Sequence, residues 1–285
     1  MGHGIAQVSA MAGHDVTIRD IEREFVDDGI DSIEANLQGG VDREKVTESE
    51  KAATLDRISG TTDLAEAVAD ADLVVEAVPE DVDLKRGTFE DVAEHAPEDA
   101  VLASNTSSLS VTEIASALDD PGRGIGLHFF NPVHLMDLVE VVVAEQTDED
   151  TVSFAEAFVE DLGKTVVSVR DTAGFASSRL GVALGVEAMR MVEEGVASPR
   201  DVDAAMELGY NHPMGPIELG DVVGLDVRLD ILEHLREELG ERFRPPQILR
   251  RKVRAGKLGK KTGEGFYVWE DGEIVGTSGD WGDDE

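Results

Sequence analysis

The sequence predicts an α/β fold in which a doubly wound, mostly parallel sheet is followed by an all-helical domain. Over the first 170 residues, short apolar runs alternate with helical patterns, which is typical of a sheet with helices on both faces. The run 73–78 (LVVEAV) is nearly continuous in apolar residues, as in a strand covered on both sides. After Asp171 only helical patterns remain. We therefore expect two domains, residues 1–170 and residues 171–285.

The first domain opens on a glycine-rich turn. Gly2 and Gly4 lead into a helical pattern that ends at Gly13, and a short strand then ends in Asp20. The spacing of 18 positions from Gly2 to Asp20 is that of the second half of a Rossmann-type unit, in which an acid about 20 residues beyond the glycines binds the ribose of a dinucleotide. The first strand and first glycines of such a unit are missing. Either the natural protein begins several residues earlier or the likeness is accidental.

Asp20 also bears on the choice of cofactor. A carboxylate at this position accepts a hydrogen bond from a ribose 2′-hydroxyl and repels a 2′-phosphate, which predicts NAD over NADP. Arg19 beside it slightly favours a 2′-phosphate. The alternative is that Asp20 is an ordinary acid at the end of a strand.

The remaining elements follow from apolar periodicity and from capping residues. Strands are predicted over 101–103 and 166–169, and helices over 21–37, 47–58 and 112–118 and around Phe89. In the second domain helices are predicted over 175–194, 198–208, 220–238 and 245–255. The residues after Gly272 are expected to be disordered.

Two apolar runs with strand composition, 125–130 and 138–143, each contain one residue able to transfer protons. These residues are His128 and Glu140. Asn131-Pro132 predicts a turn between the runs, so the chain can double back and bring the carboxylate toward the imidazole. A carboxylate bonded to one ring nitrogen fixes the tautomer, orients the ring and makes the other nitrogen a better base.

Hydroxyl side chains precede this pair in the sequence. Ser107 belongs to the polar run 104–108, which follows the predicted strand 101–103. A base, its orienting carboxylate and a hydroxyl donor suit the removal of a proton from an alcohol. The other histidines carry no such pattern: we interpret His14, His95 and His134 as core residues and His212 as a loop residue.

The chain is strongly acidic, with 61 Asp and Glu against 25 Lys and Arg and a net charge of -36. The acids are scattered over helical faces instead of forming one tail, which favours a role in solubility over a cationic partner. Dispersed carboxylates with few lysines are typical of a halophilic protein, because concentrated salt screens their repulsion. The same charge argues against nucleic acid as a partner, since phosphates would be repelled.

Cysteine is absent, which excludes disulfides, a thiolate metal site and a cysteine nucleophile. No uncharged apolar run reaches the roughly 18 residues of a transmembrane helix, and residues 1–14 lack the basic start of a signal peptide. These observations predict a cytoplasmic protein with no membrane partner and no metal.

Two features of the second domain allow two interpretations each. Gly181 and Gly185 lie one helical turn apart, which suits close helix packing, either within the chain or across a dimer. The stretch 242–261 holds nine cations and no acid. It either packs on the acidic remainder of the chain or faces a phosphate.

Six short motifs together resemble the 3-hydroxyacyl-CoA dehydrogenase family, and the resemblance covers essentially the whole chain in the right order. They are SNTSSL (104–109), LHFFNPV (127–133), LVEV (138–141), DTAGF (171–175), PMGP (213–216) and GKKTGEGFY (259–267). The resemblance implies a Rossmann domain, a helical dimerisation domain that makes a homodimer, and NAD-dependent oxidation of (S)-3-hydroxyacyl-CoA to 3-ketoacyl-CoA. Such a reaction belongs to fatty acid β-oxidation or to 3-hydroxybutyryl-CoA metabolism.

The resemblance also implies roles for individual residues. His128 matches the general base, Glu140 its partner, and Ser107 a donor near the reacting oxygen that also lies at the cofactor. Other positions match residues that contact the cofactor: Gly2, Asp20, Glu80, Lys85, Asn131 and Lys261. The helix from Ile21 is similar to the segment that covers the CoA, where Arg43 matches a cationic position.

One site position departs from the family pattern. Ser178 stands where the family usually has an asparagine near the substrate, so acyl positioning or rate is in doubt. Two other functions stay open: a dehydrogenase of a free hydroxy acid, similar to the gulonate dehydrogenases, and a catalytically silent dinucleotide-binding protein. The intact set of His128, Glu140 and Ser107 argues against silence, because no structural need calls for all three.

Overall fold

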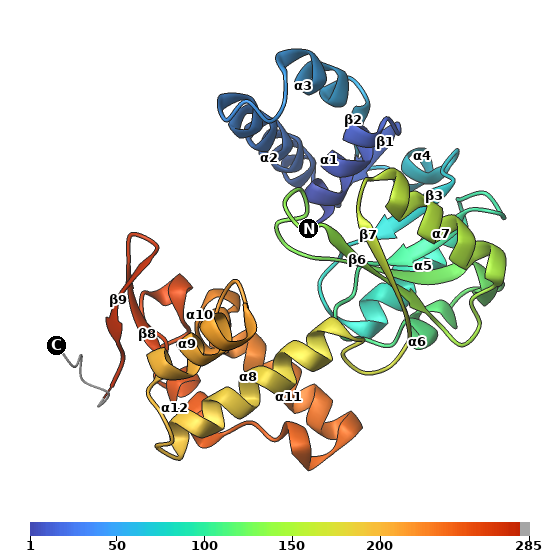
Figure 1. Cartoon of the computed structure of the whole chain (residues 1–285). Coiled ribbons are helices and arrows are strands. Elements are labelled where there is room, and N and C mark those ends of the chain that lie inside the picture. Colours follow the sequence, from blue (N-terminus) through green and yellow to red (C-terminus); the bar gives the residue numbers. More distant parts are fainter. Residues whose placement is uncertain (280–285) are drawn as a thin grey trace. The chain divides into compact units, whose positions relative to one another are not determined.

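The computed structural model describes residues 1–279 and divides the chain into two compact units, Met1–Phe175 and Ala176–Glu285 (Figure 1). The division lies a few residues beyond the boundary predicted at 170/171. The reason is local packing: Phe175 is buried in a cluster with Val111 and Val142 of the first unit. Asp171 is tied to the same unit, because its Oδ2 accepts hydrogen bonds from Ser110 Oγ (2.8 Å) and Thr112 N (2.7 Å).

The first unit alternates helices and strands, as predicted. Its helices are α1 (Gly2–Ala12), α2 (Arg23–Asp42), α3 (Glu48–Leu55), α4 (Leu64–Val68), α5 (Val82–Ala93), α6 (Val111–Ala115) and α7 (Glu149–Asp161), with a 3-10 turn η1 (Pro121–Arg123). Its strands are β1 (Val16–Arg19), β2 (Ile58–Thr61), β3 (Leu73–Glu76), β4 (Val101–Ser104), β5 (Gly124–Phe129), β6 (Leu138–Val143) and β7 (Thr165–Arg170). The helix predicted over 47–58 ends at Leu55, and Ile58 instead opens β2.

The strands form two separate sheets. Strands β3, β4, β5, β6 and β7 are neighbours in that order, and β1 pairs in parallel with β2 alone. Within residues 1–279 no strand hydrogen-bonds to both β1 and β3. This division is consistent with the expectation that the first strand of the dinucleotide-binding unit is missing from the chain.

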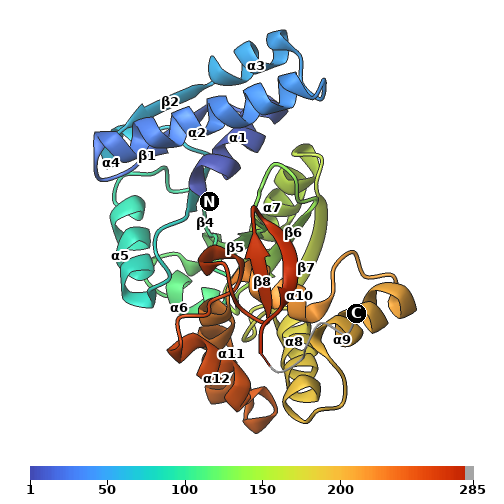
Figure 2. The same ribbon diagram turned by 90° about the vertical axis from the view of Figure 1, so that its left-hand side faces the viewer.

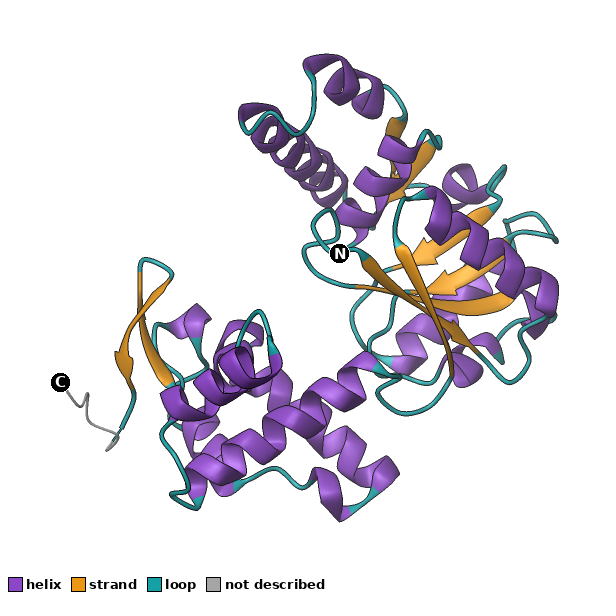
Figure 3. Cartoon of the chain, in the orientation of Figure 1, coloured by secondary structure: helices purple, strands orange, loops and turns teal. Residues whose placement is uncertain are grey.

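Helices cover both faces of the larger sheet (Figure 3). On one face, Ile5 and Val8 of α1 and Val159 of α7 pack on β4, β5 and β6. On the other face, Phe89 of α5 and Ile114 of α6 pack with Leu102 of β4. A third cluster joins α1 and α2 to the small sheet of β1 and β2. Because both faces of these strands are covered, their sequences are nearly continuous in apolar residues.

The second unit is built mainly from helices α8 (Ser177–Glu193), α9 (Pro199–Tyr210), α10 (Pro216–Val223), α11 (Leu225–Leu239) and α12 (Gln247–Arg254), with 3-10 turns η2 (Glu241–Phe243) and η3 (Lys260–Thr262). The prediction of one helix over 220–238 was wrong, because the chain breaks at Gly224, whose φ of 106° lies in the region that favours glycine.

The second unit is also not purely helical, as the hairpin of β8 (Tyr267–Glu270) and β9 (Glu273–Thr277) shows (Figure 2). The expected disorder after Gly272 is therefore wrong for 273–277, and residues 280–285 lie outside the described residues. Two buried aspartates hold the hairpin. Asp221 accepts from Phe266 N, Tyr267 N (both 2.9 Å) and Trp269 Nε1 (3.0 Å), and Asp203 accepts from Tyr267 Oη (2.6 Å).

Candidate active site

The two strands that carry His128 and Glu140 form an antiparallel hairpin, as predicted. In the register of β5 and β6, His128 lies directly opposite Glu140. His128 Nδ1 is 2.8 Å from Glu140 Oε2. The imidazole is 6% exposed and the carboxylate is fully buried. Because a carboxylate accepts, Nδ1 carries the hydrogen and Nε2 is left with a lone pair. The hydrogen bond to a buried carboxylate holds the ring in one orientation.

Aromatic side chains enclose the imidazole. The ring centroid of His128 is 4.4 Å from that of Phe130 and 5.8 Å from that of Phe175. Sequence analysis assigned neither of them a part in the site, although both belong to the family motifs quoted above. Asn105 was missed as well: its Oδ1 accepts from Phe129 N at 2.9 Å and ties the end of β4 to the end of β5. These contacts keep the ring in a largely apolar environment.

Most of the predicted site residues lie at the carboxyl ends of parallel strands. Asp20 follows β1, Glu80 follows β3, Ser107 follows β4 and Asn131 follows β5. In open α/β sheets this edge is where ligands bind. Glu80 contacts the turn that carries Ser107, since its Oε1 is 3.0 Å from Ser107 N. The structure thus groups His128, Glu140 and Ser107 within one unit.

In the first unit, the start of α1 and the end of β1 are suited to a dinucleotide. Helix α1 begins at Gly2 with no acid in its first turn and no side-chain cap, so its amino end can receive a phosphate. A Cβ added at Gly2 would lie 3.8 Å from Ala77, just beyond β3, and one at Gly4 would lie 2.9 Å from Val133, beyond β5. Asp20 binds Ile21 N through Oδ1 at 2.7 Å. This geometry brings the start of α1 to the strand ends, as dinucleotide binding requires.

Lys85 and Arg43, two further residues predicted to contact ligands, differ in their surroundings: Lys85 is buried and Arg43 is exposed. Lys85 is 1% exposed, and its Nζ lies 3.0 Å from both carboxylate oxygens of Glu76 and 3.4 Å from Glu80 Oε2. Arg43 is exposed just after α2, and its Nη1 donates to Gly39 O at 3.1 Å. Burial, and then the positive charges of Lys164 and Arg43, lower the pKa of His134. Arg43 and Lys164 therefore both lie near His134, with Asp42 and Glu44 flanking Arg43 and Asp137 near Lys164.

Two predicted residues belong to the second unit. Ser178 is half-buried in the first turn of α8. Lys261 lies in η3, where its Nζ is 2.6 Å from Asp226 Oδ2. Most cations of the stretch 242–261 likewise lie near acids of the same unit, as in the pairs of Arg250 with Glu233 and Lys257 with Glu264. These pairs favour the packing interpretation of that stretch over the phosphate-facing one.

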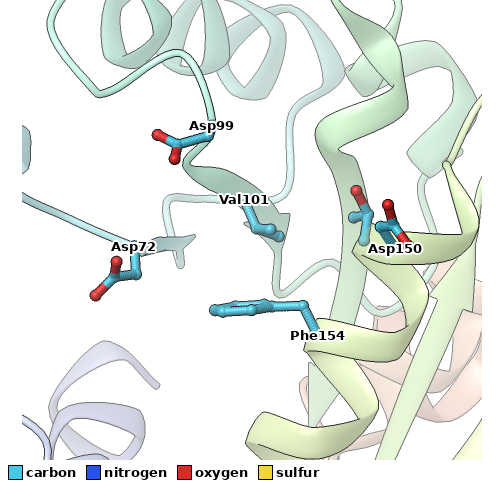
Figure 4. Close-up of a pocket in the computed structure, with 6 residues that line it drawn as sticks. Asp72, Asp99, Val101, Asp150 and Phe154 are labelled. Carbon is cyan, nitrogen blue, oxygen red and sulfur yellow. The ribbon is translucent and has the colours of Figure 1, made fainter.

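A hollow of about 310 Å³ lies elsewhere in the first unit (Figure 4). Asp72 and Asp99 line it from the residues just before β3 and β4, and Asp150 lines it from the start of α7. This is the amino edge of the sheet, opposite to the edge that carries His128. Three carboxylates around it would repel a phosphate-bearing ligand, so it is not the candidate active site.

A doubly wound unit with a buried histidine–carboxylate pair on neighbouring strands is typical of a nicotinamide-dependent dehydrogenase. Comparison with family models gives the particular family. Residues 1–172 match the model of the 3-hydroxyacyl-CoA dehydrogenase NAD binding domain, and residues 174–269 match that of the 3-hydroxyacyl-CoA dehydrogenase C-terminal domain. The chain belongs to the 3-hydroxyacyl-CoA dehydrogenase family, and its first unit is the NAD-binding domain.

Individual relatives agree along nearly the whole chain. A probable 3-hydroxybutyryl-CoA dehydrogenase of Deinococcus radiodurans is 45% identical over 270 residues, covering 94% of this chain and 96% of the relative. The mitochondrial hydroxyacyl-coenzyme A dehydrogenase of Rattus norvegicus is 44% identical over 278 residues, covering 95% and 88%. The crystal structure of (S)-3-hydroxybutyryl-CoA dehydrogenase from Ralstonia eutropha matches with a TM-score of 0.92 at 40% identity, covering 95% and 96%.

None of the helices within residues 1–279 is long and apolar enough to cross a membrane.

Proposed function

We propose that this protein oxidises the 3-hydroxyl group of an (S)-3-hydroxyacyl-CoA to a ketone with NAD⁺, and catalyses the reverse reduction with NADH. The observation that carries the proposal is the buried contact of 2.8 Å between His128 Nδ1 and Glu140 Oε2. Family membership and the names of the relatives support the substrate class. Bound NAD⁺ supplies a hydride acceptor for C3 of the substrate.

The residues of the first unit would handle the proton. His128 Nε2 takes the hydrogen of the substrate hydroxyl, and Glu140 stabilises the imidazolium that forms. In the reverse direction the imidazolium returns that proton to the developing alkoxide. The Ser107 hydroxyl donates to the same oxygen and helps to hold its charge. Phe130 and Phe175 keep water from the ring, which strengthens each of these interactions.

The test is a spectrophotometric assay of NADH oxidation with acetoacetyl-CoA, in dilute buffer and in molar KCl. We expect turnover, and His128→Ala should lower its kcat by about 10²–10⁴. Free acetoacetate serves as the contrasting substrate. Faster turnover of the free acid would favour a dehydrogenase of free hydroxy acids, and NADH binding without turnover of either compound would favour a silent dinucleotide-binding protein. The same assay with Ser178→Asn shows whether the family amide improves acyl positioning.

The positive charges of Arg43 and Lys164 near His134 support recognition of the CoA phosphates by Arg43. In a chain of net charge -36, the combined positive charge of Arg43 and Lys164 around His134 is suited to an anion. Arg43→Ala should raise KM for acetoacetyl-CoA and leave KM for acetoacetyl-pantetheine, which lacks the nucleotide, unchanged. Arg57→Ala is the matched control, because Arg57 Nη1 also donates to the carbonyl four residues earlier. Equal effects of the two variants would contradict a role for Arg43.

We also propose a homodimer through the second unit. Three large side chains of this unit are exposed to water: Leu180 (71%), Leu208 (87%) and Tyr210 (75%). A partner subunit would remove this apolar surface from water. Among the described residues nothing lies within 4 Å of a Cβ added at Gly181 or Gly185, so the small-residue face of α8 has room for a partner helix. Light scattering should give twice the monomer mass, and Leu208→Asp should shift it to the monomer. Like the dimer, a cytoplasmic location stays a prediction.

A further inference from the structure

A chain of charged side chains, buried at Glu76 and Lys85 and exposed at Glu80, connects β3 to the turn that carries Ser107. It starts at Glu76, the last residue of β3, which is 6% exposed. Both carboxylate oxygens of Glu76 lie 3.0 Å from Lys85 Nζ. Ser104 Oγ donates to one of these oxygens, and Val78 N donates to the other at 3.1 Å. Each carboxylate oxygen of Glu76 therefore accepts two hydrogen bonds.

Lys85 contacts both Glu76 and Glu80 and so links the two carboxylates. Its ammonium also reaches Val78 O at 3.2 Å and Glu80 Oε2 at 3.4 Å. These four acceptors compete for three hydrogens, so the position of Nζ is set by Glu76 and Glu80 together. An ammonium buried to this extent needs its partner carboxylate, because an unpaired buried charge is strongly disfavoured.

Glu80 in turn organises the turn 106–108 with one oxygen atom. Its Oε1 accepts from Thr106 Oγ1 (2.6 Å), Ser107 N (3.0 Å), Ser108 Oγ (3.1 Å), Ser108 N (3.2 Å) and Ser107 Oγ (3.3 Å). Burial alone would raise the pKa of Glu80, but the hydrogen bond from Thr106 and the charge of Lys85 outweigh it, and the pKa is lowered. Glu80 is thus an anion that needs these donors.

The contact from the Ser107 hydroxyl is the longest of the five. A hydroxyl has one hydrogen to donate, so Ser107 must leave Glu80 in order to donate to a substrate oxygen. The other four donors keep the carboxylate satisfied and the turn in place when it does so. The Ser107 hydroxyl is therefore the donor that this cluster can release at the least cost.

We propose that Glu76 is a positioning residue for the dehydrogenase reaction: it fixes Lys85 beneath Glu80 and thereby sets the place from which Ser107 donates to the reacting oxygen. The inference rests on the proposed function. Glu76 makes no direct hydrogen bond to residues 106–108. It reaches them through Lys85 and Glu80, and also through Ser104, whose Oγ donates to Glu76 and accepts from Thr106 N at 3.3 Å.

The test is a double-mutant cycle of Glu76→Gln with Ser107→Ala, assayed by NADH oxidation with acetoacetyl-CoA at saturating NADH. Removal of a donor to an oxyanion lowers kcat by about 10²–10³. We expect the loss of kcat in Ser107→Ala to be of this size or smaller. Glu76→Gln should lower kcat by roughly tenfold in the wild-type background and by less than about twofold in the Ser107→Ala background. Equal losses in the two backgrounds would overturn the proposal.

The matched control is Glu113→Gln. Glu113 is an exposed acid of α6 that lies 3.9 Å from Arg86 of α5, the helix that carries Lys85, so this variant also removes one charge and one ion pair. It should leave kcat unchanged. If Glu76→Gln fails to fold, Glu76→Gln combined with Lys85→Met removes both buried charges and restores a neutral core. The kcat of that double variant should be lowered to the extent expected for Glu76→Gln alone. A kcat equal to that of the wild type would overturn the proposal. An inactive wild type, by contrast, would refute the proposed function itself.

Discussion

His128 and Glu140 occupy directly paired positions of two antiparallel strands, and the imidazole Nδ1 lies 2.8 Å from the carboxylate Oε2. The pairing depends on register. A shift of one residue in either strand would turn one side chain to the opposite face of the sheet and separate the two groups. The turn over residues 131–137 and the apolar neighbours on both faces hold the register in which the pair meets.

The pair should behave as one catalytic unit. His128→Ala should lower kcat by about 10²–10⁴, the usual worth of positioned acid–base catalysis. Glu140→Gln should also lower kcat, because an amide accepts a hydrogen bond but does not stabilise the imidazolium electrostatically. The variant that carries both substitutions should be little worse than His128→Ala alone. Multiplicative losses, measured in the oxidation direction at saturating NAD⁺, would show that Glu140 does not act through His128.

Asp20 should select NAD over NADP. Its carboxylate at the end of β1 accepts from a ribose 2′-hydroxyl and repels a 2′-phosphate, so kcat/KM should be clearly higher with NADH than with NADPH. Asp20→Asn should narrow that difference. Asp15→Asn is the control, because Asp15 lies before β1, at the opposite end of the strand. A wild type that uses NADPH as fast as NADH would contradict this assignment.

The parts of the fold that could be predicted are those whose cause is local. The alternation of apolar strands and helices, the capping box of Thr47 and Glu50, and the hairpin that joins His128 to Glu140 each follow from residues close in sequence. Strand β2 was missed because its four residues, ISGT, contain a single strongly apolar side chain. The break at Gly224 and the C-terminal hairpin involve contacts with residues far along the chain: Leu225 N donates to Leu258 O, and Trp269 Nε1 donates to Asp221.

The candidate site likewise contains residues that local sequence predicts and residues whose contacts are distant in sequence. The sequence predicted His128, Glu140 and Ser107 as site residues, whereas Glu76 appears in the sequence only as a polar residue near a strand end. Its importance appears through contacts with Lys85 and Ser104, which are 9 and 28 positions away. The burial of Lys85 was equally hidden, because a lysine in an amphipathic helix ordinarily faces water.

Salt should stabilise this protein. With 61 acids against 25 cations, repulsion between dispersed carboxylates destabilises the folded chain in dilute buffer, and screening lengths fall to about 3 Å at 1 M salt. The melting temperature and the activity should both rise with KCl toward molar concentrations. Thermal melts across a KCl series at constant pH measure this. A melting temperature that is highest in dilute buffer would refute the halophilic interpretation.

The two aspartates that hold the C-terminal hairpin should give the second unit a distinct pH dependence. Burial raises the pKa of Asp221 above its ordinary 3.8, more than the hydrogen bonds from Phe266 and Trp269 lower it, and burial likewise raises the pKa of Asp203. A carboxyl group with a raised pKa in the folded state binds its proton more tightly there than in the unfolded chain. Its contribution to stability is therefore greatest at low pH and is lost as the pH rises through the folded pKa.

Asp221→Asn should remove this dependence together with part of the stability. The amide keeps one acceptor oxygen but turns its NH2 group toward at least one of the three donors, so the variant should lose about 1–3 kcal/mol at acidic pH. Because asparagine does not titrate, the stability difference between wild type and variant should shrink as the pH rises from about 4. Trp269, which donates to Asp221, reports unfolding by fluorescence when Trp281 is replaced by phenylalanine. Asp230→Asn, at an exposed position of α11, is the control and should show a constant difference. A difference for Asp221→Asn that grows with pH would mean that Asp221 is favoured in its charged form by the folded protein.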